Sequence, residues 1–258
     1  MEVIISNEAG ELSLDKGSGV ARLTFSGSGH NTFPTWKMDQ IASMIEGLNL
    51  QEVKSLVITA GEGRSFGVGG DFHEVNSFKG SDEVDEWISA CVRMYTAVLS
   101  LPIMVVAAID GYSIGIALQL ALCADYRIAS KKADLRMPEL KLGIACVLGA
   151  CLLKERIPLH IVNRMIVSCE SWPANRAYQD GLVDQVFDRD SCLSAAMECA
   201  NSLTHYQPVP VKTTKGYVNN GIIERLKDAG KVAIKAHRAG FSASQSAQEK
   251  MRKIIKKS

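Results

Sequence analysis

The order of apolar and polar residues predicts alternating strands and helices in roughly the first 156 residues of the chain. Residues Val20–Phe25 alternate with a period of two, as in a half-buried strand. Two short β-branched runs, Val53–Ala60 and Ile103–Ile109, are bounded by Gly, Pro or Asp and predict buried parallel strands. Apolar residues at helical spacing predict helices over Pro34–Leu48 and Ser81–Leu101. The pattern therefore predicts a βαβ core of the α/β class.

Beyond about Arg156 the pattern favours helices. One short strand candidate remains at Leu182–Phe187. The last predicted helix, Ser242–Lys257, ends in a lysine-rich turn, which suits the negative end of a helix dipole. We therefore expect a core over residues 1–190 and a helical C-terminal region over residues 191–258.

Composition narrows the class of protein. The chain has 258 residues, 47% hydrophobic and 22% charged, which is typical of a soluble globular protein with a substantial core. A net charge of +1 gives no general field for nucleic acid or membrane surfaces. The apolar stretches are too short for a membrane span, and the start does not resemble a signal peptide. Seven cysteines without a C-x-x-C pair favour a reducing cytoplasm over a disulfide framework or a zinc site.

Two glycine-rich loops follow predicted strands. They are Gly61–Asp71 and Asp110–Gln119, each at the carboxyl end of a strand, where open α/β sheets bind ligands. Glycine lets backbone amides approach a ligand closely, and a helix beginning near Gly115 would direct free N–H groups at it. A single loop of this kind indicates a sharp turn equally well. No Lys-Ser/Thr follows Gly69-Gly70, and the spacing is not G-x-G-x-x-G, so these are not the common phosphate loops.

Six segments of the chain resemble, in order, six motifs of one enzyme family. The segments are Asn31-Thr32, Phe66–Asp71, Gly111–Leu120, Ala124–Ala129, Met137–Gly143 and Ala174–Val183. The corresponding family motifs are an early N-A-L, F-S-A-G-A-D, G-x-x-x-G-G-G-x-x-L, C-D-x-x-I-A, P-E-x-x-L-G and A-x-x-x-G-L-V. Each match is weak alone, but the ordered set is specific. The chain thus resembles the crotonase (enoyl-CoA hydratase/isomerase) superfamily.

The resemblance implies a fold, an assembly and a site. The fold is a ββα spiral core with a helical C-terminal extension that serves in oligomerisation, as a homotrimer or hexamer. An oxyanion hole is implied at the amides of Val68 and Ile116, because these positions match the family's alanine and glycine. One preorganised donor of this kind contributes about 3–4 kcal/mol to lowering a barrier. Further substrate-binding residues are implied at Gly69, Gly70, Asp71 and Gly115.

The catalytic carboxylates depart from the family's hydratase pattern of two glutamates. Here the first position is Gln119 and the second is Glu139. An amide can orient water but cannot exchange its proton at neutral pH, whereas a single carboxylate suffices to move a proton from the α to the γ carbon. From residue type alone, an exposed loop residue is the more common role for Glu139, but its position in the P-E segment favours catalysis. Gln119 could equally be a buried structural amide. Asp71 is better explained as a helix cap, and His73 as a surface residue.

The predicted activity is that of an enoyl-thioester isomerase or hydratase/dehydratase acting through a stabilised enolate. No cofactor is expected beyond coenzyme A or phosphopantetheine as the substrate carrier. The segment Gly27–His30 lacks the basic residue that often meets CoA phosphates, and Ala145–Leu148 resembles dehydratases of polyketide β-branching that act on an acyl carrier protein. Alternatives are such a dehydratase, a non-catalytic thioester-binding homologue, or an RNA-binding homologue, which the lack of a basic stripe disfavours.

Overall fold

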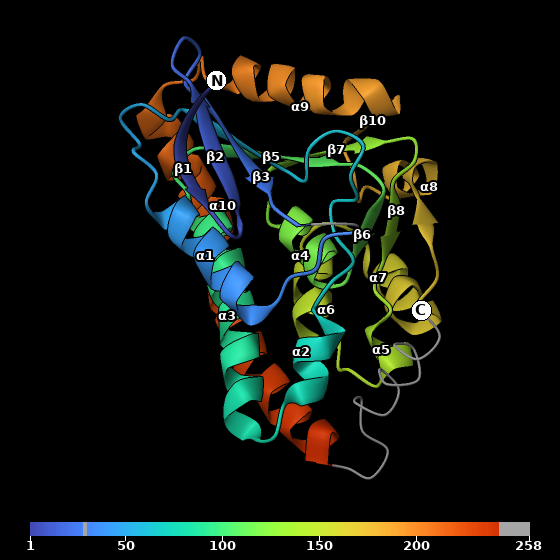
Figure 1. Ribbon diagram of the computed structural model, residues 1–258. Helices are drawn as coiled ribbons and strands as arrows, with labels where there is room; N and C mark the ends of the chain where they lie inside the picture. Colours follow the sequence, from blue (N-terminus) through green and yellow to red (C-terminus); the bar gives the residue numbers. More distant parts are fainter. Residues whose placement is uncertain (28–29, 243–258) are drawn as a thin grey trace.

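The chain folds around a seven-stranded sheet, described in a computed structural model that covers residues 1–27 and 30–242 (Figure 1). The strand order is β1-β2-β3-β4-β5-β7-β10. The first three strands are antiparallel, and β3 to β10 run parallel. Their bounds are β1 Glu2–Asn7, β2 Gly10–Asp15, β3 Val20–Phe25, β4 Ser55–Thr59, β5 Met104–Ile109, β7 Tyr126–Ser130 and β10 Gln185–Phe187.

A second, three-stranded sheet lies at the carboxyl end of the parallel strands. It consists of β6 Tyr112–Ile114, β8 Asp134–Arg136 and β9 Trp172–Pro173. Strand β6 begins three residues after β5 ends, so this small sheet starts directly from the loop that follows β5. The two sheets turn the chain into the ββα spiral expected from the sequence.

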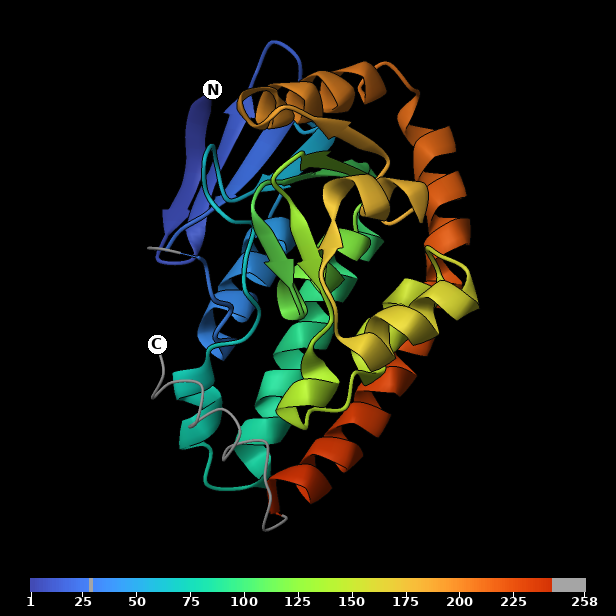
Figure 2. The same cartoon turned by 90° about the vertical axis from the view of Figure 1, so that its right-hand side faces the viewer.

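The helices cover both faces of the large sheet. Helix α9 lies across one face, and Figure 1 shows it above the sheet, whereas α1, α3 and α4 lie on the other side. Figure 2 shows the long helix α10 running down the side of the molecule. The helices are α1 Thr35–Glu46, α2 Phe72–Ser77, α3 Ser81–Ser100, α4 Ile116–Leu122, α5 Glu139–Leu142, α6 Val147–Lys154, α7 Leu159–Ser168, α8 Ala174–Gln179, α9 Arg189–Leu203 and α10 Pro208–Ser242.

Two apolar cores hold the layers together. The smaller one joins the sheet to α9 through residues such as Val57, Val106 and Ala196, all of which are buried. The larger one fills the space among the sheet, α1, α3, α4, α6 and α10. Strands β4 and β5 are therefore apolar on both faces, which explains why their sequences are continuous β-branched runs.

The strands and helices predicted for the first half of the chain are confirmed with small changes of boundary. The predicted helix Pro34–Leu48 is α1, with Pro34 at the N-cap, and the strand candidate Leu182–Phe187 is β10. Helix α10 was not predicted as one 35-residue element, and the proposed helix Ser242–Lys257 lies almost wholly outside the described residues. The division at residue 190 stays a prediction, since α9 packs on the sheet of the core. Among the helices that the structure describes, none is long and apolar enough to cross a membrane.

Candidate functional site

The two glycine loops lie side by side because they pair as short strands. Gly67 forms a parallel bridge with Ser113: its N–H donates to the Tyr112 carbonyl at 2.8 Å, and its carbonyl accepts from the N–H of Ile114 at 3.0 Å. A Cβ at Gly67 would lie only 2.4 Å from the Phe33 ring, so the backbone can approach here only as glycine. The loops after β4 and β5 thus form one wall of a common site.

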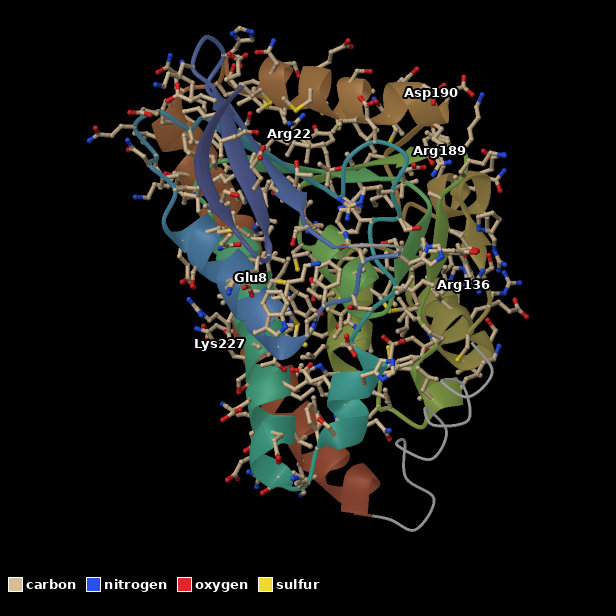
Figure 3. All side chains as sticks on the ribbon, in the orientation of Figure 1. Glu8, Arg22, Arg136, Arg189, Asp190 and Lys227 are labelled. Carbon is tan, nitrogen blue, oxygen red and sulfur yellow. The ribbon has the colours of Figure 1, made fainter. Side chains whose placement is uncertain are left out.

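The loop after β5 is also anchored from the opposite side. Asp110 accepts a hydrogen bond from the Ser130 hydroxyl at 2.5 Å and forms an ion pair with Arg189 at 2.7 Å. Arg189 is the first residue of α9, and Figure 3 shows it close to the end of that helix. Because these contacts fix the base of the loop, the helix that follows it begins at a defined place.

The backbone hydrogen bonds of the two loops argue against one of the two donors expected in the oxyanion hole. The N–H of Val68 donates to the Asn31 carbonyl at 2.9 Å, so this donor is occupied within the protein. By contrast, the N–H groups of Gly70 and Ile116 have no acceptor in the part of the chain that the structure describes. A Cβ at Gly70 would lie 3.3 Å from Cδ1 of Ile116, so the two residues are close neighbours. Gly70 and Ile116 thus form a neighbouring pair of candidate donors, with Gly70 in the place expected for Val68.

The glycines around this pair have conformations that other residues rarely adopt. Gly69 has φ +95°, and a Cβ there would lie 3.2 Å from the Ile114 carbonyl oxygen. Gly115, the N-cap of α4, has φ 55° and ψ −120°. A Cβ at Gly115 would lie 3.2 Å from Oε1 of Glu139. Gly115 therefore allows both the turn into α4 and the approach of the carboxylate to the loop.

Glu139 is a buried carboxyl group at the start of α5, immediately after Pro138. Its exposed fraction is 8%, which excludes the alternative of a solvent-exposed loop residue. Oε1 accepts a hydrogen bond from Nε2 of Gln119 at 2.9 Å. Oε2 has no partner at hydrogen-bonding distance and angle among the described residues. Burial raises the pKa of Glu139 above its ordinary value, and the neighbouring Cys146 thiol and Gln119 amide partly oppose this effect. A carboxyl group with a raised pKa is a stronger base when ionised and can both accept and return a proton.

Gln119 is held in one orientation by a tyrosine that the sequence did not suggest. The Tyr95 hydroxyl lies 3.0 Å from Oε1 of Gln119, and burial raises the pKa of Tyr95 well above its ordinary value. The hydroxyl therefore stays protonated and donates to the amide oxygen. This leaves the amide nitrogen facing Glu139, as its hydrogen bond requires. The chain Tyr95–Gln119–Glu139 fixes the direction of the carboxyl group.

These groups open into a small, mostly apolar cavity of about 100 Å³. Glu139 is the only Asp or Glu among the described residues that line it, and Lys and Arg are absent from that lining. Its aromatic and polar members include Phe72, Trp87, Gln119 and His237. A second carboxylate that could share the activation of water with Glu139 is thus missing from the described lining. In the described part of the chain, no group of three or more His, Cys, Asp or Glu side chains could hold a metal ion.

Asp71 and His73 lie outside the lining of this cavity. Asp71 is the N-cap of α2 and accepts from the N–H groups of His73 and Glu74 at 2.8 and 3.2 Å, so the interpretation as a helix cap is confirmed. His73 is exposed, as expected. Asp71 therefore caps α2 directly after the first glycine loop and does not line the cavity.

A fixed positive charge lies beside Gly27, where the sequence suggested none. The Arg64 guanidinium donates to the carbonyl groups of Gly27 and Phe25. Lys37 is also near, but it is buried, with its ammonium group 2.6–3.1 Å from the Ser26 carbonyl, the Asn31 side chain and the Thr32 carbonyl. Burial, assisted by the charge of Arg64, lowers the pKa of Lys37 to about 8. Arg64 comes from the first glycine loop, so the absence of a basic residue in Gly27–His30 does not leave this surface uncharged.

The comparison with protein families agrees with this geometry. Residues 15–256 match the family model described as enoyl-CoA hydratase/isomerase. The chain belongs to the enoyl-CoA hydratase/isomerase family. The resemblance stated from the sequence motifs is thereby confirmed, and so is the expectation of an enzyme of the hydratase/isomerase type.

Individual relatives differ in the reaction that their names describe. Carboxymethylproline synthase from Pectobacterium carotovorum subsp. carotovorum is 34% identical over 83% of this chain and 86% of its own length. The structure of ThnE from S. clavuligerus is 34% identical, with a TM-score of 0.77, and covers 88% of this chain and 100% of that one. Human mitochondrial delta3-delta2-enoyl-CoA isomerase has a TM-score of 0.89 over 96% of this chain and 97% of its own, but at 20% identity it supports the fold alone.

Proposed function

We propose that this protein forms the enolate of an acyl thioester, carried by CoA or by phosphopantetheine on a carrier protein, with Glu139 as its acid–base group. The observation that carries the proposal is the buried oxygen Oε2 of Glu139, which has no hydrogen-bond partner among the described residues and lies in a cavity lined by Gly70 and Ile116, whose N–H groups have no acceptor in the same part of the chain. A structural carboxylate at this depth would be expected to have an ionic partner. This makes a purely thioester-binding role the weaker alternative.

The amides of Gly70 and Ile116 would bind the thioester oxygen. Negative charge develops on that oxygen when the α proton is removed, so two preorganised donors stabilise the enolate more than the ground state. Glu139 would take the α proton, and Gln119 would hold the carboxyl group in place. Returning the proton at the γ carbon moves the double bond without water. A single carboxylate in an apolar cavity suits this isomerisation better than hydration, which in this family uses two glutamates.

The test measures three activities on the same protein. A 3-enoyl-CoA is offered for conversion to the conjugated 2-enoyl ester, crotonyl-CoA for hydration, and butyryl-CoA for exchange of its α protons in D₂O. We expect exchange and isomerisation, with hydration much slower. Failure of all three in the folded protein would refute enolate formation, whereas hydration faster than isomerisation would refute the assignment of the reaction.

A second candidate is a synthase in which the same enolate attacks an electrophilic carbon. The observation in its favour is the 34% identity to carboxymethylproline synthase over most of both chains. The enolate chemistry would be unchanged, and only the electrophile would differ. Exchange of the α protons of butyryl-CoA for deuterium, without migration of the double bond in the 3-enoyl ester, would favour this candidate. Assembly as a homotrimer or hexamer, mediated by the C-terminal helices, is part of the proposal and can be tested by analytical ultracentrifugation.

A further inference from the structure

The indole N–H of Trp87 is a buried hydrogen-bond donor that the mechanism above does not use. Trp87 lies on α3 with an exposed fraction of 5%, and its Nε1 atom has no hydrogen-bond partner among the described residues. Buried indole N–H groups usually find an acceptor. The buried Trp172 follows that rule, since its Nε1 donates to Asp180 at 2.7 Å. The missing acceptor of Trp87 therefore requires an explanation.

Trp87 faces the cavity of the proposed active site. It lines that cavity, and a Cβ at Gly70 would lie 3.7 Å from its Nε1 atom. Tyr95, which reaches Gln119 at the reacting end, comes from the same helix eight residues later. Eight residues correspond to about 12 Å along the axis of a helix. The backbone of Trp87 is thus displaced along α3 from that of Tyr95, and its indole N–H lies close to Gly70.

The surroundings of this donor favour a neutral acceptor. His237 packs edge-on against the Trp87 ring at 5.6 Å between ring centroids. Its Nδ1 lies 2.6 Å from the Ala233 carbonyl oxygen, which requires the proton to be on Nδ1, and burial lowers the pKa of His237. The ring is therefore neutral near pH 7. The described lining of the cavity also lacks Lys and Arg, so a carboxylate there would find no Lys or Arg side chain to pair with among the described residues, and burying it without such a partner would be costly.

We propose that the acyl group of the substrate is short and carries a neutral hydroxyl or carbonyl oxygen, at C4 or beyond, that accepts the Trp87 N–H. The inference rests on the proposed function, which places the thioester at Gly70 and Ile116. A cavity of about 100 Å³ is too small for a long alkyl chain. A plain alkyl group would leave the buried donor unpaired, so the oxygenated acyl group is preferred.

The experiment compares ligands that differ by one oxygen. Dissociation constants of butyryl-CoA, 4-hydroxybutyryl-CoA, 3-hydroxybutyryl-CoA and succinyl-CoA are measured calorimetrically on the Glu139→Gln variant, in which turnover is blocked. We expect 4-hydroxybutyryl-CoA to bind about tenfold more tightly than butyryl-CoA, the factor that corresponds to about 1.4 kcal/mol. Adding Trp87→Phe should remove this preference while leaving the ratio of 3-hydroxybutyryl-CoA to butyryl-CoA unchanged. Trp36→Phe, at an exposed tryptophan on α1, is the matched control and should leave every ratio unchanged.

The outcomes separate the two proposals. Equal affinity for butyryl-CoA and 4-hydroxybutyryl-CoA overturns the inference, as does a preference that survives Trp87→Phe. Tightest binding of succinyl-CoA overturns the neutral acceptor. A loss of affinity that is the same for all esters in Trp87→Phe places the indole against the carrier arm, which also overturns the inference. If none of the four esters binds, the proposed function itself fails, and the inference fails with it.

Discussion

Replacing Glu139 by glutamine should lower the activity but raise the stability of the protein. The carboxyl group is proposed to be essential for turnover, and it is costly to bury. The amide has nearly the same shape and can keep a hydrogen bond with Gln119, so ligand binding should survive. It cannot carry a proton between carbon atoms. General acid–base groups contribute about 10²–10⁴-fold, and we expect a loss of kcat of at least that size. This corresponds to a barrier higher by about 2.7–5.5 kcal/mol.

The same change should make the folded protein more stable at neutral pH. Burial raises the folded-state pKa of Glu139 above its ordinary value of 4.5, so ionisation of this group costs stability. The folded state then holds the proton more tightly than the unfolded state. Stability falls as the pH rises from 4.5 through the raised pKa, and this loss is absent from the variant. The melting temperature of Glu139→Gln should exceed that of the wild type at pH 8, and the difference should shrink towards pH 4.5.

Differential scanning calorimetry and the isomerase and exchange assays, run on the same samples, test both effects. For a chain of this size each 1 kcal/mol corresponds to about 2–4 °C in the melting temperature. Glu52→Gln is a matched control, because Glu52 is exposed and remote from the cavity, and it should change neither quantity. A wild-type kcat in Glu139→Gln would show that this residue is not the base. A lower melting temperature at pH 8 would show that the carboxyl group stabilises the fold through a partner and is not simply desolvated.

Three further changes test other parts of the site. Gln119→Glu would place a second carboxyl group where the Gln119 amide now lies 2.9 Å from Glu139. We expect this variant to hydrate crotonyl-CoA faster than the wild type. An unchanged rate in a folded variant would mean that the cavity limits this reaction. Gly115→Ala would put a Cβ 3.2 Å from Glu139 on a residue with φ 55°. We expect the free energy of unfolding, measured in denaturant, to fall by about 1–3 kcal/mol, and kcat in the exchange assay to fall as well. Wild-type values of both would contradict the role assigned to Gly115. For the carrier, we expect kcat/KM for an acyl-carrier-protein ester to exceed that for the matching CoA ester by about tenfold. Because Arg64 lies beside Gly27, the comparison should be repeated in the Arg64→Gln variant. Equal kcat/KM values for the two esters would refute the preference for a carrier protein. A preference for the CoA ester that is lost in Arg64→Gln would also refute it.

The location of the site followed from the sequence because parallel strands end at a common edge. The runs that became β4 and β5 are apolar on both faces, so the loops after them had to meet. Gly69, Gly70 and Gly115 also stand out in the sequence, since loops of this kind need a backbone free of Cβ atoms. Glu139 and Gln119 were recognised through motif spacing, and the structure brings their side chains into direct contact.

The Val68 amide, which the sequence placed in the oxyanion hole, shows what a sequence motif cannot supply. Val68 is excluded by a hydrogen bond to Asn31, a residue 37 positions earlier, and only the folded backbone shows that this N–H is occupied. Tyr95 and Trp87 were missed for a different reason. Both lie on a strongly amphipathic helix, where aromatic residues at helical spacing indicate core packing, and nothing local distinguishes a ring that also directs a polar atom into a cavity. The length of α10 was missed because several glycines interrupt its sequence, and packing against α3 and α6 overrides their low helix propensity.

The bridge between Gly67 and Ser113 has a consequence for how this site can change over evolution. The spacing of the two amide donors is set by main-chain pairing, and so it is insulated from substitutions of the side chains around it. The side chains of residues such as Ile116 and Trp87 can vary without moving the donors, and under the proposed function such a change would alter what happens to the enolate rather than whether it forms. If the proposed function holds, the main-chain pairing would keep the thioester-activating donors constant, and the side chains of the cavity wall would determine the product.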